Sequence, residues 1–312
     1  PITYSEYGAY AQMQKDLLGD DLSVTASMRY DKQSVMEDAN VTPRLGLLYK
    51  LSDKSNVRIS AQVGYRNPTN QDKFIGLYNG EELLLGTTED NIDRFDRTLG
   101  AADFDGDGVA ETSFNWTGDY VFNNALNKSS WDNGGNLVSE SLDFVEAEKV
   151  VSYDIGYRYN SKDFTLDMNA YYSQYENFIG TNSVYVPAAE AVALAQSFGL
   201  VGDAAVLAAM DPSTIGIAGP GAYLQFGMDA NLDVPFNTYG FSVEAIKKLN
   251  SMMSMNLIYE YNKLDYDEPE NSDFELSWNT PEHRVKLGFT STLSENVSFT
   301  ANARYNSEYY YE

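Results

Sequence analysis

The sequence predicts an all-β fold: an antiparallel transmembrane β-barrel segment of about ten strands with long extracellular loops, one of which contains short helices. Three observations support this prediction. Apolar and polar residues alternate along many runs, several runs end on tyrosine at a fixed distance, and short polar turns alternate with long connections. An alternation with a period of two gives a strand one apolar face and one polar face.

Five runs show the alternation most clearly. In each, an apolar residue follows a short polar turn, and a tyrosine follows that apolar residue eight positions later. Eight residues of strand rise about 27 Å, and a tilt of roughly 45° projects this to about 19 Å, close to the apolar band of roughly 25 Å on an outer-membrane barrel. The runs are 22–30, 57–65, 164–172, 253–261 and 297–305.

The repeated tyrosines lie where an interfacial girdle of aromatic residues is expected. Tyr49 and Tyr159, which each precede a tight turn, supply the girdle at the other membrane surface. A soluble β-sandwich also alternates and is the alternative fold. Its strands usually have about 5 to 6 residues and need no aromatic residue at a fixed height, so the pattern favours the membrane barrel.

Turns and alternation together divide the chain into strands joined by connections of two kinds. We expect the strands at 3–17, 22–35, 42–51, 56–66, 147–159, 164–178, 236–248, 253–264, 282–293 and 297–310. Tight turns at 18–21, 52–55, 160–163, 249–252 and 294–296 lie at one end. The other end carries the long segments 67–146 and 179–235, which outer-membrane barrels place outside the cell.

The composition excludes several classes of function. Cysteine is absent, which suits a bacterial envelope protein and removes disulfides, thiolate catalysis and cysteine metal sites. The net charge of −25 argues against a nucleic-acid partner, because phosphate binding needs a basic surface. No apolar run approaches the length of a transmembrane helix. The chain starts at Pro1 in a mid-strand context, so we expect an internal segment whose signal peptide, if there is one, lies outside it.

The two long segments differ in character. Residues 67–146 carry 16 Asp and Glu against 4 Lys and Arg, so acidity is concentrated at the outer mouth. Within 179–235, residues 187–210 have an alanine-rich helical composition, with Pro187 suited to the first helical turn and Gly199 to a stop. A fixed helical cap on the rim and a moving lid over a ligand are both compatible with this composition.

Several motifs resemble the barrel of TonB-dependent outer-membrane receptors. They are TPRLGLLYK at 42–50, NVRISAQVGYRNPTNQD at 56–72, EAEKVVSYDIGYR at 146–158 and NTPEHRVKLGF at 279–289. The element Tyr65–Arg66–Asn67–Pro68 is similar to the family's aromatic-Arg-x-Pro strand end, and QDKFIGL is similar to the Bacteroidetes branch, whose members often carry a carboxypeptidase-like regulatory domain. The resemblance spans nearly the whole chain in order.

The resemblance implies a 22-strand barrel filled by an N-terminal plug, with this chain as about half of the barrel wall and without the plug. It implies an active transporter that takes up a scarce nutrient with energy from the TonB–ExbB–ExbD complex. Membrane lipid and lipopolysaccharide are further implied partners, and a surface lipoprotein lid would fit the same family. A passive or structural barrel and a calcium-stabilised surface adhesin are the alternatives. The substrate stays open among iron chelate, vitamin, glycan and peptide.

The segment DFDGDGVAE at 103–111 predicts a calcium site. Carboxylates at alternating positions and glycines that permit a tight wrap place hard oxygens around one point. Position twelve is Phe114 where an EF-hand has glutamate, which argues against a helix-flanked EF-hand, and a solvated turn without a metal is the alternative. The expected Ca²⁺ ligands are Asp103, Asp105, Asp107, the Val109 carbonyl and Glu111.

Other candidate residues carry weaker signals. Trp116, Tyr120, Phe122 and Trp131 could form a ligand platform, or they could pack the first long loop against itself, which we favour. We expect no enzyme, because His283 is the only histidine and no P-loop, dinucleotide or G-x-S-x-G motif is present. We expect His283 at the rim or in the lumen. The interleaved polar residues Arg29, Arg58, Asp167 and Arg304 should face the lumen.

Overall fold

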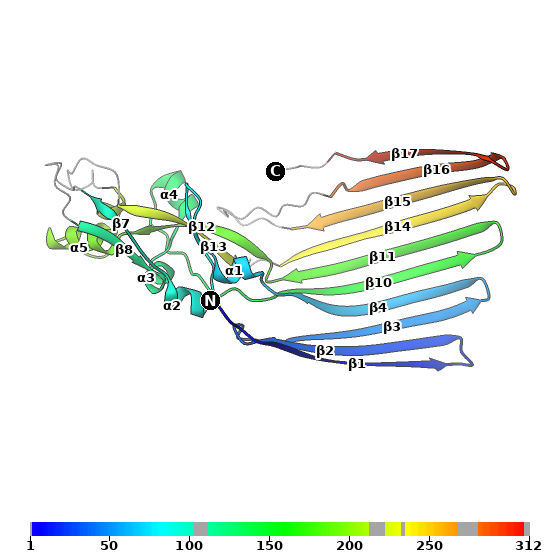
Figure 1. The fold of residues 1–312 in the computed structure, drawn as a ribbon, viewed down its shortest axis with the longest axis horizontal. Coiled ribbons are helices and arrows are strands. Elements are labelled where there is room, and N and C mark those ends of the chain that lie inside the picture. The colour runs from blue at the N-terminus through cyan, green and yellow to red at the C-terminus, as the bar shows by residue number, and fades with distance from the viewer. Residues whose placement is uncertain (1, 103–111, 212–221, 232–234, 267–279, 309–312) are drawn as a thin grey trace.

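Ten long strands form one antiparallel sheet in the computed structural model of the chain (Figure 1). The structure describes residues 2–102, 112–211, 222–231, 235–266 and 280–308. The sheet order is β1-β2-β3-β4-β10-β11-β14-β15-β16-β17. The strands are β1 (Glu6–Leu17), β2 (Leu22–Gln33), β3 (Asn40–Ser52), β4 (Ser55–Arg66), β10 (Glu148–Asn160), β11 (Phe164–Glu176), β14 (Phe236–Lys248), β15 (Met253–Asp265), β16 (His283–Ser294) and β17 (Val297–Asn306).

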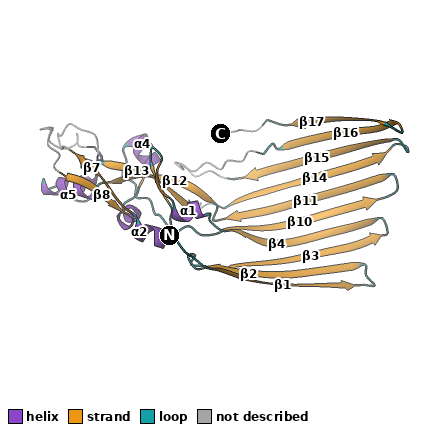
Figure 2. Ribbon diagram, in the orientation of Figure 1, coloured by secondary structure: helices purple, strands orange, loops and turns teal. Residues whose placement is uncertain are grey.

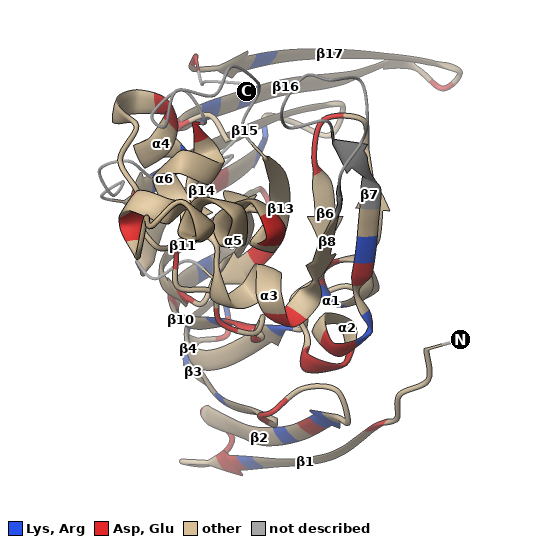
Figure 3. Cartoon of the chain, turned by 90° about the vertical axis from the view of Figure 1, so that its left-hand side faces the viewer, with Lys and Arg blue, Asp and Glu red and all other residues tan. Residues whose placement is uncertain are grey.

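All ten strands expected from the sequence are present, with bounds that differ by a few residues. Neighbouring strands in the chain that are joined by tight turns pair in register, as in β10 and β11, where Ile155 lies opposite Ala170 and Gly156 opposite Asn169. The sheet is open, with β1 and β17 at its edges. Viewed from the end with the long connections, it curves like part of a barrel wall (Figure 3).

The two faces of the sheet have the predicted character. Apolar side chains on one face are exposed, for example Ile59, Tyr153, Ile155 and Phe241, with exposed fractions of 46%, 52%, 54% and 43%. An apolar side chain that no protein atom covers faces lipid in a membrane barrel. The tyrosines that end the five runs lie on this face at the loop end, and Tyr49 and Tyr159 lie toward the turn end.

Glycines on the polar face let longer side chains lie flat on the sheet. Gly156 of β10 is paired with Arg58 of β4 on one side and Asn169 of β11 on the other. The Arg58 guanidinium crosses Gly156 and reaches Asp167 of β11, with 2.6 Å between Nη2 and Oδ1. Tyr171 crosses Gly240 in the same way, and its hydroxyl donates to Oδ1 of Asn262 at 2.8 Å.

The two long connections fold together into one unit, which we call the loop module (the described residues of 67–146 and 177–231; Figure 2). A five-stranded sheet in the order β5-β6-β13-β12-β9 combines strands from both connections, and β13 runs parallel to β6. A two-stranded sheet, β7 (Asp96–Ala102) and β8 (Thr112–Thr117), packs nearby. The five strands are β5 (Gly76–Tyr78), β6 (Leu83–Leu85), β9 (Leu126–Asn127), β12 (Ile179–Pro187) and β13 (Tyr223–Asn231).

The sequence did not predict β12 and β13 within the second long connection. Their partners β6 and β9 come from the first connection, so no nearby turn marks the pairing. Six short helices complete the loop module: α1 (Asn70–Phe74), α2 (Glu89–Arg94), α3 (Gly118–Asn123), α4 (Lys128–Gly134), α5 (Ala189–Ser197) and α6 (Asp203–Met210). No helix in the described part of the chain is long and apolar enough to cross a membrane.

Helices α5 and α6 fall within the predicted helical range 187–210. Gly199 follows Phe198, the C-cap of α5, and has a φ of +88°, so its predicted role as a stop is confirmed. The prediction for Pro187 was wrong, because this residue ends β12 and opposes Tyr223 of β13. A proline is tolerated there because it lies at the last position of the strand.

Candidate functional site

Both long connections leave the large sheet around Glu148, the first residue of β10. Two guanidinium nitrogens of Arg66, the last residue of β4, donate to the Glu148 carboxylate: Nε to Oε2 and Nη2 to Oε1. The backbone N–H of Ile179, which begins β12, donates to the same carboxylate at 2.9 Å. Glu148 is only 9% exposed. One buried carboxylate therefore links the end of the first connection, its start at Arg66 and the start of the second connection.

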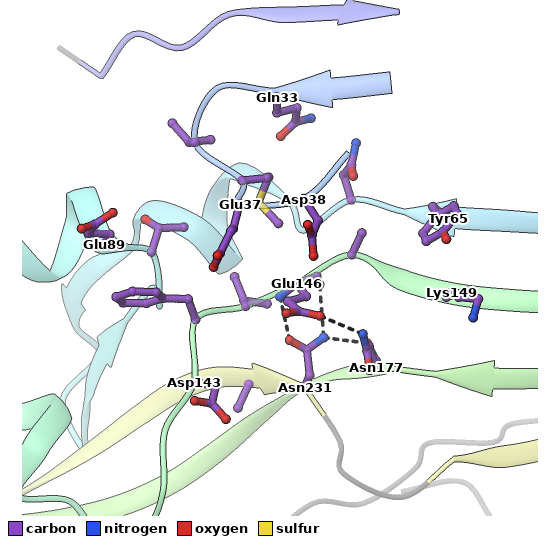
Figure 4. Close-up of a pocket in the computed structure, with 18 of the residues that line it drawn as sticks. Gln33, Glu37, Asp38, Tyr65, Glu89, Asp143, Glu146, Lys149, Asn177 and Asn231 are labelled. Carbon is purple, nitrogen blue, oxygen red and sulfur yellow. Dashed lines mark hydrogen bonds between the residues drawn. The ribbon is translucent and has the colours of Figure 1, made fainter. Parts of the chain in front are cut away.

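We call these contacts of Glu148 the first joint between the loop module and the large sheet. A second joint, formed by asparagine side-chain amides, lies beside it. The Asn231 side chain at the end of β13 accepts from the Glu146 N–H at 2.7 Å and donates to the Asn177 carbonyl at 2.7 Å (Figure 4). Asn177 has a φ of +56°, a left-handed conformation that asparagine adopts more readily than most residues. Together the two joints hold the loop module against the rim of the large sheet.

A cleft of about 1410 Å³ opens at this junction, between the connection of β2 to β3 and the loop module (Figure 4). Lys149 is the one basic residue among the described residues that line it, and its Nζ is 2.7 Å from Oε2 of Glu176. Tyr65 and Lys149, which oppose each other on the tyrosine face, lie at its edge. Eight carboxylates line the cleft: Glu37, Asp38, Glu89, Asp90, Glu140, Asp143, Glu146 and Glu176.

This arrangement attracts cations and repels anions, because one lysine cannot neutralise eight carboxylates. The sequence predicted an acidic outer mouth, and the ribbon segments coloured red for Asp and Glu on the loop module in Figure 3 agree with that expectation. It did not identify the cleft itself. The lining residues come from eight separate stretches of the chain, and the acidity of the sequence was the one signal that pointed to them.

A half-buried carboxylate lies in the loop module close to this junction. Asp229 of β13 accepts from the Thr181 hydroxyl at 3.0 Å. Burial raises the pKa of Asp229 to about 6, and the hydrogen bond from Thr181 opposes the rise. The nearby charge of Asp72 raises the pKa of Asp229 further. Asp229 therefore titrates close to neutral pH.

The aromatic residues proposed for a ligand platform do not share one surface. Trp116 is 2% exposed, its Nε1 donates to the Val186 carbonyl at 3.2 Å, and its ring meets Phe114 edge to face at 5.9 Å. Tyr120 is half-buried and packs against the same core, and burial raises the pKa of its hydroxyl. Trp131 is half-buried on α4. Trp116 thus packs the loop module internally.

The proposed calcium ligands Asp103, Asp105, Asp107, Val109 and Glu111 lie outside the described residues. Among the residues that the structure describes, no cluster of three or more His, Cys, Asp and Glu has the geometry of a metal site. His283 lies at the loop end of β16 on the tyrosine face, where its Nδ1 is 2.9 Å from the Tyr259 hydroxyl and its ring packs on Tyr261.

Comparison with known proteins agrees with this architecture. A family model described as "TonB dependent receptor-like, beta-barrel" matches residues 1–312. Among solved structures, the siderophore receptor PirA of Pseudomonas aeruginosa matches with a TM-score of 0.53 and 12% identity over 96% of this chain and 37% of that chain. No curated protein matches the chain in sequence.

Two further structures show the same fold. The ferric enterobactin receptor PfeA of Pseudomonas aeruginosa (G324V mutant) has a TM-score of 0.55 and 13% identity, covering 96% of this chain and 32% of that chain. The FrpB iron transporter of Neisseria meningitidis (F3-3 variant) has a TM-score of 0.53 and 13% identity, covering 97% and 33%. The chain therefore spans about a third of the length of these proteins.

Proposed function

Because the chain belongs to the TonB-dependent receptor-like β-barrel family, we propose that it forms part of the wall of a transporter that takes up a scarce nutrient with energy from TonB. The protein is located in the bacterial outer membrane, and its apolar face meets lipid. The match of the family model over all 312 residues is the observation that carries the proposal. The mechanism is binding and gating, without covalent chemistry.

The loop module would lie outside the cell, because the connections at its end of the sheet are long and those at the other end are tight. There it would meet the nutrient first. The acidic cleft favours a ligand with positive charge or with none at the point of contact. Matched structures are named as receptors or transporters of siderophores, iron and copper, so iron chelates and copper ions are the first probes to test.

The test is uptake by cells that express the intact protein, with and without a functional TonB. The probes are radiolabelled ferric chelates and copper ions, in cells that lack other iron and copper receptors. We expect accumulation of at least one probe that requires both the protein and TonB and that stops when a protonophore dissipates the proton gradient. Protein-dependent uptake that continues without TonB would overturn the proposal in favour of a passive barrel, and so would an absence of uptake for every probe.

A further inference from the structure

Three neighbouring hairpins carry exposed lysines at the end of the sheet with tight turns. The hairpins β3–β4, β10–β11 and β14–β15 are adjacent in the sheet order (Figure 1). Lys54 and Lys162 lie in the first two turns, and the backbone of the two turns is joined by a hydrogen bond from the Asn160 N–H to the Lys54 carbonyl at 2.7 Å. Lys247, near the end of β14, opposes Phe164 of β11. All three side chains are exposed.

These lysines have no acidic partner within the described part of the chain. Two basic residues elsewhere, one in the loop module and one at the rim, do have carboxylate partners. Lys128 is 2.6 Å from Asp132 and Lys149 is 2.7 Å from Glu176. In a chain with a net charge of −25, cations without a carboxylate partner are available to a partner outside the chain.

The positive charge is local to these hairpins. Lys50 and Lys248 add two more exposed lysines at the strand ends, and Asp53 and Asp163 are the acidic residues of the three turns. The flanking hairpins are acidic instead. The β1–β2 hairpin has Asp16, Asp20 and Asp21 beside Lys15, and the β16–β17 turn has Glu295.

Lys247 lies beside aromatic residues of the lipid face, near the end of the sheet with tight turns. Lys247 has its Nζ 6.0 Å from the centroid of the Phe164 ring, and that ring lies 6.2 Å from the ring of Tyr159. Aromatic residues on the lipid face mark the interface of a membrane protein. A lysine beside them can keep its aliphatic stem against the apolar surface and extend its ammonium group to the headgroups.

We propose that Lys54, Lys162 and Lys247 bind the phosphate groups of anionic phospholipids in the leaflet that faces the tight turns. The proposal goes beyond transport and rests on the proposed function only for insertion of the barrel in a membrane. Basic residues near a membrane surface attract anionic lipids, and the attraction weakens as salt screens it. Three lysines on adjacent hairpins would therefore gather such lipids on one sector of the wall.

The test uses the intact protein in nanodiscs that contain phosphatidylcholine and phosphatidylglycerol. Electron spin resonance with spin-labelled lipids measures the preference of the motionally restricted shell for each headgroup. The test variant carries K54Q, K162Q and K247Q together. One control, K15Q, removes a lysine near the tight-turn end of the acidic β1–β2 hairpin, and a second, K128Q, removes a paired lysine of the loop module.

We expect the protein to prefer phosphatidylglycerol at low salt, and the triple variant to lower that preference roughly threefold to tenfold. Both controls should keep it. No preference in the unmodified protein, an unchanged preference in the triple variant or an equal loss in K15Q would each overturn the proposal. If the triple variant keeps the lipid preference but loses crosslinks to a periplasmic protein, the lysines bind a protein partner and the proposal is overturned. Failure of the protein to enter nanodiscs would instead count against the membrane barrel.

Discussion

Arg58 and Asp167 form an ion pair across a strand that belongs to neither of them. Arg58 is in β4 and Asp167 in β11, and the pair passes over Gly156 of β10 with 2.6 Å between Nη2 and Oδ1. A Cβ atom at position 156 would lie 2.8 Å from Arg58 Nη2 and 3.0 Å from its Nε. Glycine at this position is what permits the contact.

Replacement of Gly156 by valine should therefore break the ion pair. We expect the barrel to assemble with a lower thermal unfolding temperature, and the coupling free energy between Arg58 and Asp167 to fall from roughly 0.2–1 kcal/mol to near zero in a double-mutant cycle in the G156V background. The matched control is G46A on the same face of β3, where a new Cβ would meet only the Thr25 carbonyl at 4.0 Å. Retained coupling in G156V would contradict the prediction.

Arginine at Ala61 or Ala170 should destabilise the protein far more than arginine at Gln62. The alanines lie on the apolar face near the middle of β4 and β11, and Gln62 lies on the polar face one residue away. Near the bilayer midplane the cost should be roughly 2–4 kcal/mol. Urea titration of the protein in liposomes measures it, and equal costs at positions 61 and 62 would contradict the assignment of the faces.

Single cysteines placed in this chain, which has none among its 312 residues, should report the orientation of the barrel wall. A membrane-impermeant maleimide added to intact cells should label S197C at the end of α5 and should not label S52C or S161C at the tight turns. Lysed cells, in which all three should react, provide the control. Labelling of the turns from outside would reverse the orientation.

The loop module should be more stable at pH 5 than at pH 7.5. The pKa of Asp229 is raised to about 6, so the folded state holds this proton more tightly than the unfolded state does. The stability contribution therefore falls as pH rises from about 4 through about 6, by on the order of 2 kcal/mol. Hydrogen exchange of β12 and β13 amides, corrected for intrinsic rates, measures it. D229N should abolish this dependence, whereas E81Q at an exposed site should leave it intact.

The calcium loop stays a prediction, because residues 103–111 lie outside the described structure. Three aspartates within five residues repel one another unless a cation neutralises them. Chelation should increase proteolysis between Asp103 and Glu111 and leave the strands protected. The variant D105N/D107N should be cleaved equally with and without calcium. If protease cleavage of the unmodified protein is the same before and after chelation, the segment is a solvated turn that binds no calcium.

The sequence revealed the large sheet because its pattern is local. A strand such as β2 (Leu22–Gln33) or β11 (Phe164–Glu176) has an apolar medium on one face and a polar medium on the other. Successive residues therefore alternate between apolar and polar, which can be seen in the sequence. The sequence did not reveal the loop module, because its contacts join residues that are far apart in the chain. Val184 and Phe226 are buried by partners from another connection, and the cleft joins Glu37 to Glu140 and Glu176 across several strands.

The parallel pairing of β6 with β13 has a consequence for how the protein folds. Gln225 and Glu82 lie side by side, with a 3.0 Å hydrogen bond between them, yet they are 143 residues apart in sequence. Forming such a contact in the unfolded chain costs a large loop-closure entropy. The cost is smaller once β4, β10, β11 and β14 have paired and brought the two connections together. The hairpins of the wall should therefore form early and the loop module last. A deletion within the first connection should leave the second without its core while the wall still assembles.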